Sequence, residues 1–246
     1  MATHRPAGAQ ADVPDIAVTL DGNHLRLIVD GAALLDALIA LIAGARTSLK
    51  LYYYIFSGDD CGMAVRDALV AARARGVVVT LMVDGFGSAR TPDSFFAPLV
   101  EAGAHFGRFG TRRSTRYLIR NHQKMAIADD TQVLIGGFNV ENGYFGIPPR
   151  DSWADMGLWI EGPQVEAMTR WYGQLWRWVS TKKQRFRTLR RMVRHWHPSL
   201  HHDPAERLAG GRRCELLVGP ALELAQRLAP DVANSVDVGH GGKNAR

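Results

Sequence analysis

The chain has 246 residues, of which 46% are hydrophobic and 22% are charged, and its formal net charge is +6. These values are ordinary for a soluble globular protein with one large domain or two small ones. Two cysteines, Cys61 and Cys214, exclude a disulfide framework and favour a reducing compartment. The polar N-terminus does not predict a secretory signal, and the most hydrophobic run, residues 31–45, contains Asp36 and is too short to span a bilayer.

The basic excess is confined to one segment. Residues 181–213 hold ten Lys or Arg against two acidic residues, whereas the rest of the chain is slightly acidic. Such a local patch favours contact with phospholipid headgroups or nucleic acid, and a solvated linker is an equally good interpretation.

Apolar runs and breakers predict the first elements. Residues 31–45 predict a buried helix. The following segments predict a buried strand at 48–56, a helix at 63–75 before Gly76, a strand at 77–84, a helix from 91 to about 102, and a strand at 105–109. In the helix from 91 to about 102, Thr91 is expected to cap the helix and Pro92 to occupy its first turn. This order favours an α/β fold with a mixed, mostly parallel sheet flanked by helices.

The second half adds three strands and a helix. Strands are expected at 123–128 and 132–136, around a turn at 129–131, and at 155–161. Pro163 opens an amphipathic helix with a buried stripe at Val165, Met168, Trp171, Leu175 and Trp178. We expect residues 1–17 to be disordered, 181–213 to be a basic linker or helical segment, and 214–246 to be a strand that starts a missing second repeat, followed by a polar tail.

The stretch NHQKMAIADD, residues 121–130, carries the chemistry. On a strand, His122 and Lys124 share one face. Gly136 and Gly137 follow, allow a close backbone approach to a ligand, and precede Asn139. A histidine with fixed amino and amide donors suits nucleophilic attack on a phosphodiester. The spacing does not suggest a metal site, so no metal or other cofactor is expected.

The pattern H-x-K-x4-D-x6-G-G-x-N, which begins at His122, resembles the signature of the phospholipase D superfamily. The flanking stretches SLKLYYYIFSGDD, RGVVVTLMVDGFGS and DSWADMGLWIEGPQV look like the first half of bacterial cardiolipin synthases and related phosphatidyltransferases. The resemblance covers roughly residues 18–220. It implies a catalytic half-domain at 18–180 that works through a phosphohistidine without a cofactor.

The resemblance also implies residue roles. His122 would be the nucleophile or general acid, Lys124 and Asn139 would bind phosphate, and Asp155 would hold the far nitrogen of the histidine. Asp129 belongs to the motif, but its place in a turn favours structural support. Weaker candidates for contact with phosphate or headgroup are Gly136, Gly137, Arg116 and Arg120.

The family mechanism uses two histidines, and the sequence contains one H-x-K. A symmetric homodimer, a separately encoded second half and a truncated product all remain open, with a slight preference for the last. The expected activity is phosphatidyl transfer at the cytoplasmic face of a bacterial inner membrane, with an anionic phospholipid such as phosphatidylglycerol as substrate and residues 181–213 on the membrane. A metal-independent endonuclease homodimer acting on nucleic acid is the less favoured alternative, and an inactive fragment is the third.

Overall fold

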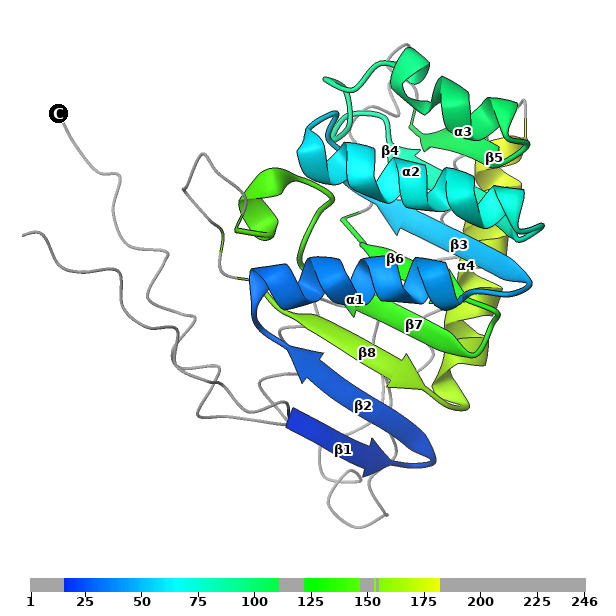
Figure 1. Cartoon of the computed structure of the whole chain (residues 1–246). Helices are drawn as coiled ribbons and strands as arrows, with labels where there is room; N and C mark the ends of the chain where they lie inside the picture. The colour runs from blue at the N-terminus through cyan, green and yellow to red at the C-terminus, as the bar shows by residue number, and fades with distance from the viewer. Residues whose placement is uncertain (1–15, 111–121, 147–152, 154, 182–246) are drawn as a thin grey trace, which may run out of the picture.

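Eight strands form one sheet in the order β1-β2-β8-β7-β6-β3-β4-β5 (Figure 1). The computed structural model describes residues 16–110, 122–146, 153 and 155–181. Its elements are β1 (Ile16–Leu20), β2 (Asn23–Ile28), α1 (Gly31–Gly44), β3 (Ser48–Tyr53), α2 (Asp60–Ala74), β4 (Val78–Asp84), η1 (Asp93–Phe96), α3 (Ala97–Glu101), β5 (His105–Phe109), β6 (Met125–Ala128), β7 (Gln132–Gly136), η3 (Asn142–Tyr144), β8 (Gly157–Glu161) and α4 (Gln164–Ser180).

The α/β class is confirmed, but the expectation of a mostly parallel sheet is wrong. Only β3·β4 and β4·β5 are parallel pairs among the described strands, and the other five pairs are antiparallel. The parallel pairs are those joined by helical crossovers, as such pairs require. A short turn joins β6 to β7 and therefore makes them antiparallel. β6 then lies beside β3, which precedes it by more than 70 residues.

Both faces of the sheet are covered. Helices α1, α2 and α3 pack on one face and α4 packs on the other (Figure 1). Alternate residues of β3 serve the two layers: Leu49, Leu51 and Tyr53 face the first helix layer, and Tyr52 faces α4. All five residues of the predicted stripe of α4 are buried.

Local chemistry explains where the helices begin and end. Asp30 caps α1 by accepting from the backbone N–H of Ala33, and Asp59 caps α2 by accepting from that of Gly62. Gly76 follows α2 with a φ of +87°, a conformation that favours glycine. Thr91 does not cap the next helix as predicted. Its hydroxyl donates instead to the carbonyl of Phe56, and a 3-10 turn at Asp93–Phe96 precedes α3.

The hairpin of β1 and β2 has no counterpart in the sequence-based expectations. β1 (IAVTL) begins at Ile16 and exposes its three central residues, whereas β2 (NHLRLI) buries Leu25 and Leu27 at alternate positions. The basic segment from 182 onward, the strand expected after residue 213, and Arg116 and Arg120 all lie outside the described residues. No described helix has both the length and the apolar character to cross a membrane.

Candidate functional site

Strand directions bring the predicted site residues to one edge of the sheet, and this edge is formed by the ends of strands and not by an outer strand. β3 and β7 end at this edge, and the antiparallel strands β6 and β8 begin there. Tyr54 follows β3, His122 and Lys124 precede β6, Asn139 follows β7, and Asp155 precedes β8. Segments separated by up to 101 residues in the sequence therefore contribute to one polar cluster.

His122 and Lys124 both lie against the ring of Tyr54. The His122 imidazole lies tilted against the face of this ring, with 3.8 Å between centroids and an interplanar angle of 31°. The Lys124 ammonium lies 5.6 Å from the centroid of the same ring, and it donates to the backbone carbonyl of His122 at 2.7 Å. The imidazole belongs to an exposed residue, whereas Lys124 is only 8% exposed. β6 begins at Met125, so the pair precedes the strand on which the sequence predicted it.

Both the oxygen and the nitrogen of the Asn139 side-chain amide have hydrogen-bond partners. Its Oδ1 accepts from the backbone N–H of Ile55 at 2.9 Å, and its Nδ2 donates to the hydroxyl of Tyr144 at 2.9 Å. The residue is 3% exposed. It therefore links the segment after β3 to the turn that contains Tyr144, in addition to any contact with phosphate.

Asp155 lies between Gly137 and Lys124. Its Oδ1 accepts from the backbone N–H of Met156 at 2.7 Å. Burial raises the pKa of Asp155, while the N–H groups of Met156 and Gly137 and the charge of Lys124 oppose that rise. Burial lowers the pKa of Lys124, and Asp155 opposes that change. The two groups thus stabilise each other's charge inside a partly desolvated site. The predicted contact between Asp155 and His122 stays a prediction.

The two glycines are needed for packing against protein atoms. A Cβ on Gly137 would lie 2.4 Å from Oδ1 of Asp155, and a Cβ on Gly136 would lie 2.5 Å from the carbonyl oxygen of Met156. The space beside each glycine is therefore filled by the chain itself. The expected approach of a ligand to the backbone of these glycines stays a prediction.

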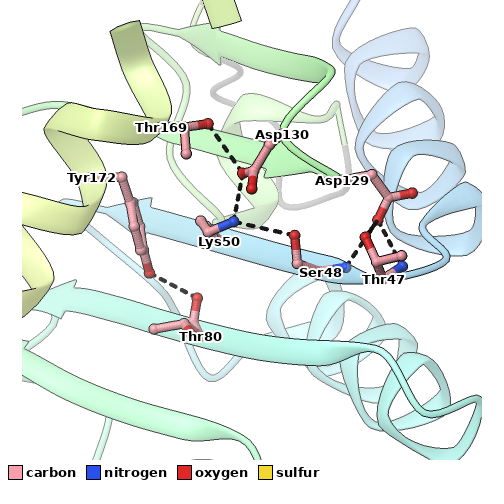
Figure 2. Close-up of polar contacts among 8 residues, drawn as sticks. All are labelled: Thr47, Ser48, Lys50, Thr80, Asp129, Asp130, Thr169 and Tyr172. Atoms are coloured by element: carbon pink, nitrogen blue, oxygen red, sulfur yellow. Dashed lines mark hydrogen bonds and ion pairs between the residues drawn. The ribbon is translucent and has the colours of Figure 1, made fainter. Parts of the chain in front are cut away.

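Asp129 lies at the opposite edge of the sheet, where β6 ends and β3 begins (Figure 2). Its carboxylate accepts from the backbone N–H groups of Arg46, Thr47 and Ser48 and from the Thr47 hydroxyl, at 2.8–2.9 Å. Burial raises its pKa, but these hydrogen bonds prevail and lower the pKa to about 2. These hydrogen bonds agree with the structural role that the turn position of Asp129 favours, and a part for Asp129 in the reaction stays a prediction.

The neighbouring Asp130 strengthens the same corner. Its carboxylate pairs with Lys50 of β3 and accepts from the hydroxyl of Thr169 in α4 (Figure 2). On the same face of the sheet, the hydroxyl of Tyr172 donates to the carbonyls of Leu51 and Thr80. This edge therefore fixes α4 to the sheet and carries no part of the polar cluster around His122.

Sequence reasoning missed two aromatic members of the site. Tyr54 was included in an apolar run that predicted core packing, and Tyr144 lies in a short turn without a recognisable pattern. The position of Tyr54 at the end of a buried strand was the available signal. Among the described residues, no group of three or more His, Cys, Asp or Glu side chains is arranged to hold a metal ion.

Comparison with known proteins extends these observations. Residues 38–176 match the family described as "Cardiolipin synthase, PLD-like domain". The chain is 34% identical to the major cardiolipin synthase ClsA of Bacillus subtilis over 157 residues, which cover 62% of this chain and 33% of that enzyme. The aligned region thus spans about a third of that relative's length.

Two solved structures share the fold. NucT from Helicobacter pylori has a TM-score of 0.51 at 19% identity, covering 63% of this chain and 96% of NucT. The phosphatidylserine synthase of Haemophilus influenzae has a TM-score of 0.52 at 15% identity, covering 74% of this chain and 44% of that protein. The family match covers more than half of the residues, and the chain therefore belongs to the PLD-like domain family of cardiolipin synthases.

Proposed function

We propose that this chain is a phosphatidyltransferase of the phospholipase D type, with His122 as the nucleophile. The observation that carries this proposal is the convergence of His122, Lys124, Asn139 and Asp155 at one sheet edge from three separate segments. An exposed imidazole beside a buried ammonium group suits a reaction in which a nucleophile attacks an anionic phosphodiester.

The proposed reaction has two balanced steps. A ring nitrogen of His122 forms a bond to phosphorus, the bond to the leaving alcohol breaks, and a general acid protonates that alcohol. The acceptor hydroxyl then loses its proton to the same group and attacks phosphorus, which breaks the phosphorus–nitrogen bond and releases His122. Lys124 stabilises the negative charge on the non-bridging oxygens, and the second N–H of the Asn139 amide donates to one of them.

The general acid is a second histidine in this proposal. It comes from a second copy of the chain or from a separate second half, because one H-x-K is present in the sequence. A symmetric dimer would place two equivalent edges face to face and supply one His122 for each role. Phosphatidylglycerol is the proposed substrate on the strength of the cardiolipin synthase relatives, and the basic segment 181–213 is the proposed membrane contact.

The test combines one mass measurement with two substrates. The purified protein is incubated with phosphatidylglycerol vesicles and, separately, with plasmid DNA, after its oligomeric mass has been determined. We expect cardiolipin or phosphatidic acid from the vesicles, with loss of product in His122→Ala. The matched control is His105→Ala, because His105 opens β5 at the opposite edge of the sheet and should leave activity unchanged.

The other outcomes contradict the proposal in distinct ways. Metal-independent cleavage of DNA without lipid turnover would establish the nuclease alternative. A homodimer that is inert on both substrates would favour the non-catalytic alternative, because the dimer would supply both histidines. Equal lipid turnover by the wild type and His122→Ala would remove His122 from the mechanism.

A further inference from the structure

We propose that Tyr54 is a positioning residue that holds the imidazole of His122 and the ammonium group of Lys124 in register for attack. This inference rests on the proposed role of His122. The Tyr54 ring lies 3.8 Å from the His122 ring, centroid to centroid, and 5.6 Å from the Lys124 ammonium. One aromatic ring therefore contacts both groups of the H-x-K pair.

His122 needs such a support because it precedes the ladder of β6. The strand begins at Met125, which pairs with Tyr52 and Ile135. The hydrogen bond from Lys124 to the His122 carbonyl fixes the backbone at this point, and it does not determine the side-chain rotamer of His122. The ring contact with Tyr54 restrains that rotamer.

Tyr54 is itself rigidly held. The hydroxyl of Ser88 donates to the Tyr54 carbonyl at 3.1 Å and accepts from the N–H of Phe56 at 3.0 Å. These two hydrogen bonds hold the backbone at Tyr54 and just after it. Gly87 packs so closely that a Cβ there would lie 2.3 Å from the Tyr54 carbonyl oxygen and 3.0 Å from its ring. Tyr54 is 9% exposed. The ring is thus fixed from behind and presents a face to His122.

Stacking has a chemical advantage over a hydrogen bond as the means of holding a nucleophilic imidazole. The nitrogen lone pair and the N–H bond of imidazole lie in the ring plane, whereas the contact with Tyr54 uses the face of the ring. The contact with Tyr54 itself therefore occupies neither nitrogen of the imidazole. The aromatic face also favours the nearby ammonium group of Lys124.

Two substitutions at Tyr54 separate the ring from its hydroxyl. Tyr54→Phe keeps the ring and should retain kcat and KM. Tyr54→Leu removes the ring, and kcat should fall about threefold to tenfold, as expected from the energy of one aromatic pair. KM should change by less than about twofold, because an effect on the chemical step does not alter ground-state binding. Phe86→Leu is the matched control, since Phe86 is an exposed aromatic residue just beyond the end of β4.

A second measurement does not depend on activity. In proton NMR, the ring protons of His122, assigned by their loss in His122→Gln, should be shifted upfield in the wild type and in Tyr54→Phe. The shift should disappear in Tyr54→Leu. Unchanged kcat and unchanged His122 shifts in folded Tyr54→Leu would overturn the positioning role and leave the proposed function intact. Full activity of His122→Ala would overturn the proposed function, while the NMR result would still report whether the rings stack.

Discussion

Asp129→Asn tests whether the last residue of the H-x-K-x4-D pattern is structural or catalytic. In the wild type, Oδ1 accepts three hydrogen bonds, from the N–H and hydroxyl of Thr47 and from the N–H of Ser48. Oδ2 accepts a fourth from the N–H of Arg46. The asparagine retains one oxygen, but its NH2 group faces a donor at the other position. Asparagine also tolerates the φ of 53° at this residue, so the substitution isolates the charge and the hydrogen bonds.

The size of the effect follows from the pKa of the carboxyl. Burial alone raises this pKa, yet the four hydrogen bonds lower it from 3.8 to about 2. A shift of this size corresponds to at most about 2.4 kcal/mol in the free energy of unfolding, at 1.36 kcal/mol per unit. The carboxylate is partly exposed, and solvent screening reduces the expected loss to about 1–1.5 kcal/mol.

The direction of the pKa shift of Asp129 determines the pH range in which this residue stabilises the fold. Because the folded state has the lower pKa, Asp129 stabilises the fold at pH values above about 4, and this contribution is lost as the pH falls toward 2. Urea unfolding of wild type and Asp129→Asn, followed by tryptophan fluorescence, should therefore differ at pH 7 and converge near pH 2. Asp67→Asn removes an exposed carboxylate from a surface ion pair and serves as the control, with little expected change.

Activity provides the refuting result. Lipid turnover by folded Asp129→Asn should match that of the wild type, because the residue lies at the edge opposite His122. An inactive variant with undiminished stability would show that Asp129 acts in the reaction. An equal loss of stability at pH 7 and near pH 2 would show that the charge is not what stabilises the corner.

Two further substitutions test the packing around the site. Gly137→Ala would place a Cβ 2.4 Å from the Asp155 carboxylate and should reduce turnover at least about tenfold with the fold retained. The control is Gly173→Ala, whose Cβ meets open space in α4. This control should stabilise the helix by up to about 1 kcal/mol and leave activity unchanged. Equal activity of both alanine variants would show that the position of Asp155 does not matter. Tyr53→Phe removes a buried hydroxyl that has no hydrogen-bond partner in the described part of the chain, so the free energy of unfolding should stay the same or rise by up to about 1 kcal/mol. A clear loss in thermal or urea unfolding would reveal a partner for that hydroxyl.

The elements that the sequence predicted best are those with a strong internal pattern. β5 and β7 have the predicted bounds, and the stripe of α4 is buried throughout. β1 and β2 are short and were not predicted, although IAVTL is largely apolar and NHLRLI alternates polar and apolar residues as a half-buried strand does. The direction of the strands was mispredicted for a different reason. Pairing of β3 with β6 is decided by tertiary packing between distant segments, and local periodicity carries no information about it.

In the site too, some residues are predicted by a local sequence pattern and others are brought in by tertiary packing alone. The sequence pattern identified His122 and Lys124 because their residue types and spacing are unusual beside an apolar strand. The support from Tyr54 was not predictable in this way, since a tyrosine in the run SLKLYYYIF is equally well placed for the core, where Tyr52 and Tyr53 lie. Only the pairing of β3 with β6 shows that this tyrosine lies beside the H-x-K pair.

The spacing of the motif corresponds to the length of the chain that runs along β6 from one set of strand ends to the other. Seven residues from His122 to Asp129 at about 3.3 Å per residue span roughly 23 Å, which carries the chain from one edge of the sheet to the other. Asp129 and Asp130 both have positive φ, as the centre of a type I′ turn requires, and the chain then returns along β7. Gly136 donates its N–H to the Lys124 carbonyl at 3.3 Å, so the return strand brings Gly137 and Asn139 back to the end of the hairpin at which Lys124 lies. A one-residue insertion in β6 would turn Lys124 to the other face, whereas the identity of Asp129 matters for closing the hairpin at its far end.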